Sequence, residues 1–201
     1  MDILLPPTGT GPGVLVAHPW WGLNRTIRDY GAALAEQGFV VGLVDAFEGE
    51  VTTEIARAEE FLGKYMKSAG PVITAAVREL AEHPSVTGTG VGAIGFSFGG
   101  FQLLKALDDT TLPLNRLVGY YAVYPLPERH VPVLAHFAGK DDFETDEDMA
   151  EMARALADAG GPNASFSYPG TAHWFAEADR PEYDPAAARL AFERTVEFLR
   201  G

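Results

Sequence analysis

Short apolar runs alternate with longer stretches of helical periodicity along almost the whole chain. Six such runs are found, at residues 13–17, 39–45, 90–96, 116–123, 131–137 and 165–168. Strands that are apolar throughout are typically buried on both faces of a parallel sheet, and the segments between them are long enough for crossover helices. The pattern therefore predicts an α/β fold, with a mostly parallel central sheet and helices on both faces.

Helices are expected between these runs, at residues 24–37, 99–107, 145–159 and 185–199, with two more within 53–82. Asn24 or Thr26 can cap the first helix, and Thr145 can cap the helix that begins with three acidic residues. Gly70-Pro71 is expected to divide the long region into two helices. No linker rich in Gly, Pro or Ser interrupts the chain, so residues 1–201 are expected to form one domain.

The composition excludes several kinds of site. There is no cysteine, which rules out disulfides, thiolate metal ligands and a cysteine nucleophile, and fits a reducing compartment. Twenty-eight acidic against 15 basic residues give a net charge of −13, which disfavours nucleic acid and anionic membranes as partners. With neither a signal-peptide pattern nor an apolar stretch of about 18 residues, we expect a cytoplasmic protein.

The sequence G-F-S-F-G at residues 95–99 matches the pattern G-x-S-x-G. It follows an expected strand and precedes an expected helix, which is where this pattern holds the nucleophilic serine of α/β-hydrolases. The alternatives are a glycine-rich turn that only packs well and a phosphate-binding loop. The second lacks the required Lys-Ser or Lys-Thr pair after the glycines. The pattern thus predicts an α/β-hydrolase fold with Ser97 as nucleophile.

A serine nucleophile needs a base that is oriented by an acid. In this fold the order along the chain is serine, acid, histidine, and His173 is the only histidine after the acidic loop that follows the fifth apolar run. That loop holds Asp141 and Asp142. Asp141 is the preferred acid because G-x-D is the usual arrangement at this place, and Asp142 is the alternative.

The oxyanion of the reaction needs backbone N–H donors. The N–H of Phe98, directly after the serine, is one expected donor, and that of Trp20, in the loop after the first apolar run, is the other. The side chains of Trp20, Trp21, Phe98 and Trp174 either line the substrate pocket or belong to the ordinary core.

Taken together and in order, several segments resemble the dienelactone hydrolase family from Gly13 onward. These segments are VLVAHPWWGLN, GFSFGG, RLVGYYAVYP, HFAGKDDF, GTAHWFAE and FERTVEFL. The resemblance aligns Ser97, Asp141 and His173 with that family's nucleophile, acid and base. It places Trp20 at the second oxyanion position.

The chain departs from the better-known members of that family at three positions. Those members have a cysteine in place of Ser97, a glutamate in place of Pro19 and a carboxylate-binding arginine in place of Glu177. Arg57 is a candidate for a second such arginine. We expect Glu177 near the mouth of the pocket, where it would repel a substrate carboxylate. Trp21, Trp174, Glu177 and Arg57 are accordingly the candidate substrate-binding residues.

The motifs and the resemblance predict hydrolysis of a carboxylic ester or lactone through an acyl-enzyme, with no cofactor and no metal. Two alternatives are open at this point: an acyl hydrolase acting on amides or thioesters, and a non-catalytic binding protein that keeps the scaffold. The expected partner is a small-molecule ester or lactone. The natural substrate and the oligomeric state are left open.

Overall fold

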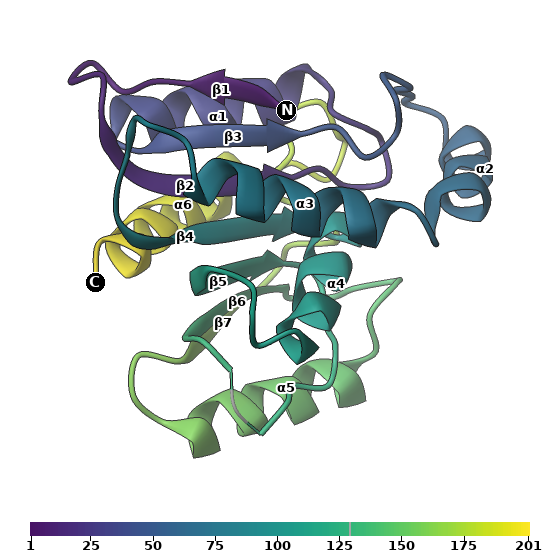
Figure 1. Ribbon diagram of the computed structural model, residues 1–201. Coiled ribbons are helices and arrows are strands. Elements are labelled where there is room, and N and C mark those ends of the chain that lie inside the picture. Colours follow the sequence, from purple (N-terminus) through teal and green to yellow (C-terminus); the bar gives the residue numbers. More distant parts are fainter. Residues whose placement is uncertain (129) are drawn as a thin grey trace.

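A seven-stranded sheet forms the centre of the molecule in a computed structural model that describes residues 1–128 and 130–201 (Figure 1). The strand order is β1-β3-β2-β4-β5-β6-β7. The strands are β1 (Asp2–Leu4), β2 (Gly11–Ala17), β3 (Val40–Val44), β4 (Val86–Phe96), β5 (Leu114–Tyr120), β6 (Val133–Ala138) and β7 (Ala164–Tyr168). The predicted α/β fold with a mostly parallel sheet is confirmed.

Only β1 runs antiparallel, paired with β3 at the edge of the sheet. The six apolar runs correspond to β2 through β7, and all neighbouring pairs among these are parallel. Strand β1 was not predicted, because it has three residues and no alternating pattern. The predicted end of β5 is also wrong: the strand ends at Tyr120, because Tyr121 has φ 38° and turns the chain away.

Helices cover both faces of the sheet. They are α1 (Arg25–Glu36), α2 (Ile55–Tyr65), α3 (Ala69–Ala81), α4 (Phe98–Lys105), α5 (Asp146–Ala159) and α6 (Pro185–Arg200), with a short 3₁₀ turn η1 (Ala106–Asp108) after α4. Helices α3, α4 and α5 lie on one face, whereas α1 and α6 lie on the other, and α2 stands at the end of the sheet (Figure 1).

The helix ends follow from local sequence. Asn24 caps α1, since its side chain accepts a hydrogen bond from Ile27 N at 3.1 Å, and Thr145 caps α5 by accepting one from Asp148 N at 3.1 Å. The break between α2 and α3 falls before Ala69, earlier than the predicted Gly70-Pro71. Pro71 lies in the first turn of α3, where its missing N–H leaves no hydrogen bond unmade.

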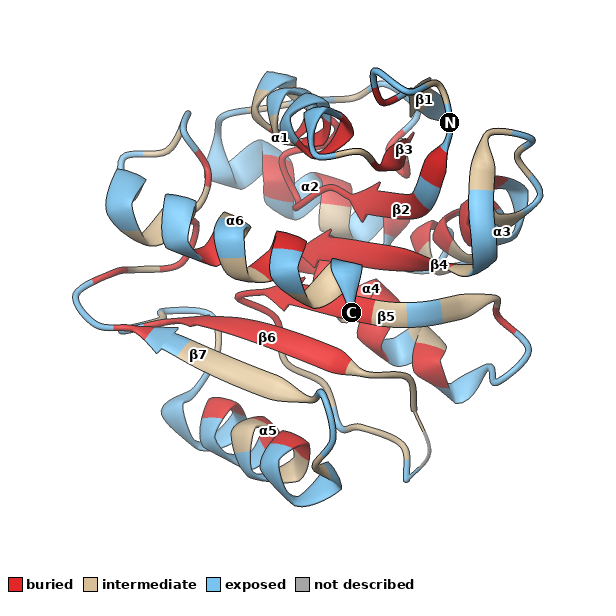
Figure 2. Ribbon diagram, turned by 90° about the vertical axis from the view of Figure 1, so that its left-hand side faces the viewer, coloured by how far each residue is buried: buried red, intermediate tan, exposed pale blue. Residues whose placement is uncertain are grey.

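The core lies between the sheet and the two helix layers (Figure 2). Strands β3 and β6 are buried along their whole length. The longer helices expose one side to solvent, whereas α4 is buried over most of its residues. Each fully buried large aliphatic or aromatic side chain contributes roughly 1.5–3 kcal/mol relative to exposure. A rigid sheet of this kind fixes the positions from which the loops at its edge depart.

The loops that hold the candidate site leave one edge of the sheet. Ala17 pairs with Gly95, Phe96 with Tyr120, and Ala138 with Tyr168, so the carboxyl ends of these parallel strands lie side by side. The segments after β2, β4, β6 and β7 therefore converge there. In parallel α/β sheets this edge is where ligands bind.

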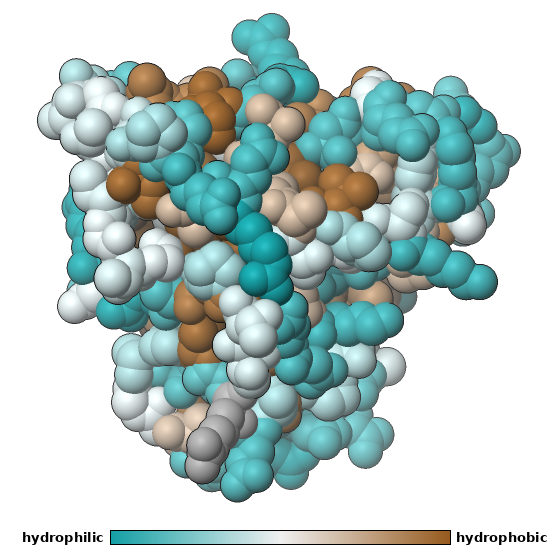
Figure 3. All heavy atoms as spheres, in the orientation of Figure 1, coloured by the Kyte–Doolittle hydropathy of each residue, from teal (hydrophilic) through white to brown (hydrophobic). Residues whose placement is uncertain are grey.

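The surface agrees with the acidic composition. On the face shown in Figure 3, hydrophilic residues predominate and hydrophobic ones lie in small separate areas. Among the residues described, none of the helices has the length and apolar character needed to cross a bilayer.

Candidate active site

Ser97 stands in a strained turn between β4 and α4. Its φ is 46°, in the left-handed region that residues with a side chain rarely adopt. The neighbouring glycines leave room for this turn: a Cβ on Gly95 would come within 2.4 Å of Gly100, and one on Gly99 within 2.6 Å of the carbonyl oxygens of Ala17 and His18. The turn holds the serine side chain at the edge of the sheet, against the loop after β2.

The structure brings Ser97, His173 and Asp141 together in one hydrogen-bonded chain. The Oγ of Ser97 lies 2.9 Å from Nε2 of His173. On the other side of the imidazole ring, Nδ1 lies 2.8 Å from Oδ1 and 2.7 Å from Oδ2 of Asp141. This geometry places the proton of the ring on Nδ1 and leaves Nε2 free to accept the serine proton.

The Asp141 carboxylate is held by its own loop. Its Oδ1 accepts hydrogen bonds from the backbone N–H groups of Phe143 at 2.9 Å and Glu144 at 3.1 Å. Burial raises the pKa of Asp141, but His173 and these two donors outweigh it, and the net effect lowers the pKa. The alternative acid, Asp142, has a side chain that is 81% exposed, with its nearest ion-pair partner the Nζ of Lys140 at 4.0 Å.

The two residues expected to donate to the oxyanion both lie near Ser97. Phe98 is the first residue of α4, so its N–H is one of those that a helix leaves without an intrahelical acceptor. Trp20 belongs to the loop after β2, and both residues line the same pocket as Ser97. His18 anchors that loop: its Nδ1 lies 2.7 Å from the carbonyl oxygen of Pro19, and its Nε2 accepts from Ala46 N at 3.1 Å.

A pocket of about 200 Å³ opens in front of the serine. Its lining is mostly aromatic and aliphatic, and consists of Trp20, Leu62, Met66, Ser97, Phe98, Phe101, Phe143, Glu144, His173 and Trp174. The ring of Trp20 stacks on that of Trp174, with centroids 5.8 Å apart. Three of the four proposed wall residues, Trp20, Phe98 and Trp174, therefore line the pocket, whereas Trp21 is 1% exposed and does not.

The expected position of Glu177 at the pocket mouth is wrong. Its side chain is completely buried, and its Oε1 accepts a hydrogen bond from the hydroxyl of Tyr121 at 2.8 Å. Trp174, with φ 68°, begins a tight turn in which Glu177 N donates to Trp174 O at 2.9 Å, and the chain passes inward after His173. Spacing along the chain could not reveal this turn. Burial raises the pKa of Glu177 to about 8.

Arg57 also does not lie in the pocket. It belongs to α2, its side chain is half-exposed, and its guanidinium forms ion pairs with Glu50 at 2.8 Å and with Glu60. It is absent from the residues that line the pocket. The candidate role of Arg57 in holding a substrate carboxylate is therefore not supported by its position.

Two residues near the triad were not identified from the sequence. Tyr121 packs its ring 4.8 Å from that of His173, and Glu144 lines the pocket. Glu144 lies in the acidic stretch after Asp141, a pattern typical of a solvated helix start. Only its closeness in sequence to Asp141 could have indicated a place near the active site. Across residues 1–128 and 130–201, no three His, Cys, Asp or Glu side chains are grouped so that they could hold a metal ion.

Comparisons with known proteins agree with the family resemblance. The model of the "Dienelactone hydrolase family" matches residues 3–201. The chain is 28% identical to a probable 2-oxo-3-(5-oxofuran-2-ylidene)propanoate lactonase from Bradyrhizobium sp., over 96% of this chain and 85% of that protein. It is 29% identical to a carboxymethylenebutenolidase from Pseudomonas sp. strain P51, over 98% of this chain and 87% of that enzyme.

Among solved structures, the dienelactone hydrolase-like promiscuous phosphotriesterase P91, from metagenomic libraries, has the same fold. It superimposes with a TM-score of 0.83 at 22% identity, over 98% of this chain and 90% of that one. The match of the family model covers all but the first two residues of the chain. The chain therefore belongs to the dienelactone hydrolase family.

Proposed function

We propose that this protein hydrolyses carboxylic esters or lactones, with Ser97 as nucleophile, His173 as base and Asp141 as the orienting acid. The single observation that carries the proposal is the continuous chain of hydrogen bonds from Ser97 Oγ through His173 to Asp141, with distances of 2.9 Å and 2.7 Å. An inert scaffold has no need to keep a strained serine, a buried imidazole and a buried carboxylate in line.

In the acylation step, Ser97 Oγ attacks the carbonyl carbon of the substrate while Nε2 of His173 takes the hydroxyl proton. The carbonyl oxygen becomes an oxyanion, which the backbone N–H groups of Trp20 and Phe98 stabilise. Removing one such donor costs roughly 3–4 kcal/mol in other serine hydrolases. The proton on Nε2 then passes to the leaving alkoxide, and the C–O bond breaks to give an acyl-enzyme.

In the deacylation step, His173 takes a proton from water, whose oxygen attacks the acyl carbon. The second tetrahedral species collapses, Ser97 Oγ regains the proton, and the carboxylic acid leaves. Throughout both steps Asp141 keeps the imidazole oriented and stabilises its charged form. Its lowered pKa keeps the carboxylate ionised in the pH range where His173 must accept a proton.

The proposal that the cleaved bond is an ester or lactone bond is supported by the names of two relatives and by the chemistry of the pocket. The two relatives described above are a lactonase and a carboxymethylenebutenolidase by name, and both names denote cleavage of a cyclic ester. The apolar walls around Ser97 suit an acyl group without charge. Amides and thioesters are the second class of acyl substrate, since the same triad can act on them.

The test combines covalent labelling with two matched variants. A fluorophosphonate should label wild-type protein at Ser97, and Ser97→Ala should lose both the label and activity, on the order of 10⁴–10⁶-fold in kcat. Asp141→Asn should lose about 10⁴-fold, because the imidazole then holds the wrong tautomer. Asp142→Asn removes the same charge one residue away and should keep turnover within a factor of two. Full activity in Ser97→Ala, or loss of activity in Asp142→Asn alone, would refute the assignment.

A further inference from the structure

Glu144 is the only acidic side chain that lines the active-site pocket, as far as the described residues show. It follows Asp141 by three residues, and its own N–H donates to the Asp141 carboxylate at 3.1 Å. Its side chain is half-buried, beside the backbone of Val123. The loop therefore holds Glu144 at the wall of the pocket.

No lysine or arginine of the described residues lines the pocket to offset this charge. Two arginines on other segments are engaged elsewhere: Arg57 with Glu50 and Glu60, and Arg180 with the ring of Trp21, 4.3 Å from its centroid. A ligand carboxylate in this pocket would thus meet Glu144 without a counter-ion.

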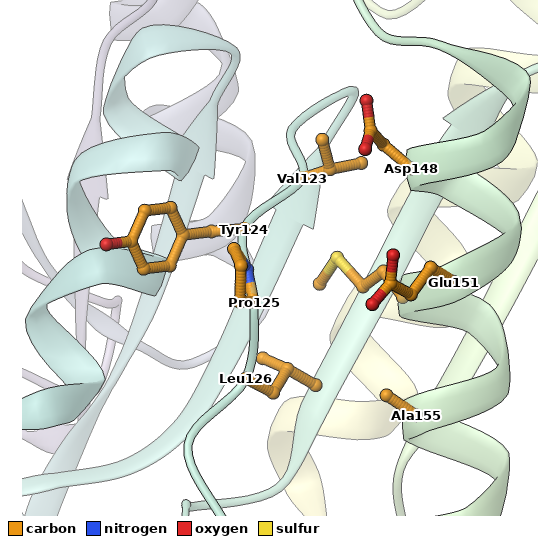
Figure 4. Close-up of a pocket in the computed structure, with 8 residues that line it drawn as sticks. Val123, Tyr124, Pro125, Leu126, Asp148, Glu151 and Ala155 are labelled. Atoms are coloured by element: carbon orange, nitrogen blue, oxygen red, sulfur yellow. The ribbon is translucent and has the colours of Figure 1, made fainter.

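Beyond Val123 the acidic character continues. A second hollow of about 380 Å³ lies between the segment 123–126 and helix α5 (Figure 4). Asp148 and Glu151 point into it from α5, and none of the described residues that line it is a lysine or arginine. Asp148 also acts on Glu144 electrostatically. Two further carboxylates therefore lie on the helix that follows the loop of Glu144.

We propose that Glu144 is the residue that sets substrate charge in this enzyme, so that the pocket accepts uncharged acyl groups and rejects those with a free carboxylate. The proposal rests on the proposed ester or lactone hydrolysis at Ser97. It assigns to Glu144, on the loop before α5, the selectivity that we had expected from Glu177. In chemical terms, the substrate is an ester or lactone with an apolar, uncharged acyl part.

Titration of Glu144 gives the proposal a second readout. Burial, then the negative charges of Asp141 and Asp148, raise the pKa of Glu144 to about 7, against the opposing effect of the Val123 backbone. His173 is the other titratable group that lines the pocket. The carboxylate gains its charge as pH rises through 7, so rejection of anionic substrates should increase from pH 6 to pH 8.

The experiment uses a matched pair of substrates: the p-nitrophenyl ester of a dicarboxylic half-acid, and the same ester with its free carboxylate converted to a primary amide. The ratio of kcat/KM for the two substrates does not depend on the titration of His173, since the same triad acts on both. The wild-type ratio should favour the amide, and increasingly so from pH 6 to pH 8. Glu144→Gln should shift it towards the half-acid by on the order of tenfold at pH 8 and low salt, and remove its pH dependence.

Asp142→Asn is the control, because it removes one charge from the same loop at an exposed side chain. It should change the ratio less than twofold. An unchanged ratio in Glu144→Gln, or an equal shift in Asp142→Asn, would overturn the role of Glu144.

A binding measurement separates this proposal from the proposed function. Fluorescence of Trp20 and Trp174, in the pocket wall, can report binding of both esters to Ser97→Ala, with and without Glu144→Gln. If neither ester is turned over by wild-type protein, the proposed hydrolysis fails for this class. The affinities still decide on Glu144: tighter binding of the half-acid by the double variant supports it, and equal binding refutes it.

Discussion

His173 and His136 are both buried, yet their surroundings prepare them for opposite tasks. Nδ1 of His173 faces the carboxylate of Asp141, and its Nε2 faces Ser97 Oγ at 2.9 Å in the wall of a pocket. His136 lies within β6, where Nδ1 is 2.8 Å from the hydroxyl of Tyr168 and Nε2 is 3.0 Å from Thr195 Oγ1. Burial without a carboxylate lowers the pKa of His136 to about 3.

The region around His136 is a polar network between the sheet and two helices. Thr195 Oγ1, in α6, also bonds the hydroxyl of Tyr120 at 2.8 Å, which in turn bonds that of Tyr30, in α1, at 3.1 Å. These neutral groups join α1 and α6 to the sheet and offer no path for a proton to substrate. Burial and full hydrogen bonding thus do not make a histidine a base; an adjacent carboxylate and an accessible nucleophile do.

Truncating each histidine should separate the two tasks, and this is the largest effect we expect. His173→Ala should lower kcat/KM by about 10⁴–10⁶-fold, as loss of a triad base does, while the protein stays folded. His136→Ala should keep kcat within a few-fold but lower the free energy of unfolding by about 2–4 kcal/mol, because it leaves a cavity and unpaired hydroxyls.

Urea unfolding and ester turnover, measured on both variants, check this pair. A His136→Ala protein that is as stable as wild type but inactive would contradict the distinction between the two histidines.

Glu177 extends the comparison to a carboxyl group. It belongs to the loop of His173, but like His136 it is buried in surroundings that favour its neutral form. Its pKa is raised from 4.5 to about 8, mainly by burial. Between these pH values the folded state holds a proton that the unfolded state has lost, so this group's contribution to stability is present below pH 4.5 and is lost as pH rises towards 8.

Glu177→Gln removes this dependence and keeps an acceptor for the Tyr121 hydroxyl. Relative to wild type, the variant should be little changed in stability at pH 5 and gain on the order of 3 kcal/mol by pH 8. Thermal unfolding across this pH range measures the difference. The exposed Glu147→Gln serves as control and should show no such trend. A constant difference between Glu177→Gln and wild type would mean that Glu177 is ionised in the folded protein.

The parts of the molecule that sequence could predict are those set by local patterns. Apolar runs located β2 through β7, and G-x-S-x-G placed Ser97 between a strand and a helix. The order of motifs along the chain then selected Asp141 and His173, which the fold brings together because their loops leave adjacent parallel strands.

The predictions from the sequence were wrong or incomplete where contacts between distant parts of the chain determine the local structure. The strand β1 exists because β3 offers it an edge, and its three residues carry no signal of their own. Glu177 turns inward because Trp174 adopts a left-handed conformation, which no propensity would assign to a tryptophan. Glu144 faces the pocket for a similar reason: its loop is folded around the Asp141 carboxylate. Charge selectivity was therefore assigned to the wrong glutamate.

Arg57 provides the smallest expected effect and tests whether any charge outside the pocket matters. Its guanidinium forms ion pairs with Glu50, which precedes α2, at 2.8 Å and with Glu60 on α2. It also lies 4.9 Å from the ring centroid of Phe61. Exposed ion pairs of this kind contribute about 0–1 kcal/mol, and their cations are already neutralised by their partners. Arg57→Ala should therefore change kcat/KM for the half-acid ester and for its amide by less than twofold each, and the free energy of unfolding by less than about 1 kcal/mol. Assays at low and moderate salt are the measurement, since long-range attraction would appear only at low salt. A tenfold loss confined to the half-acid ester would show that Arg57 holds a substrate carboxylate, and it would place anion recognition on α2 instead of its rejection at Glu144.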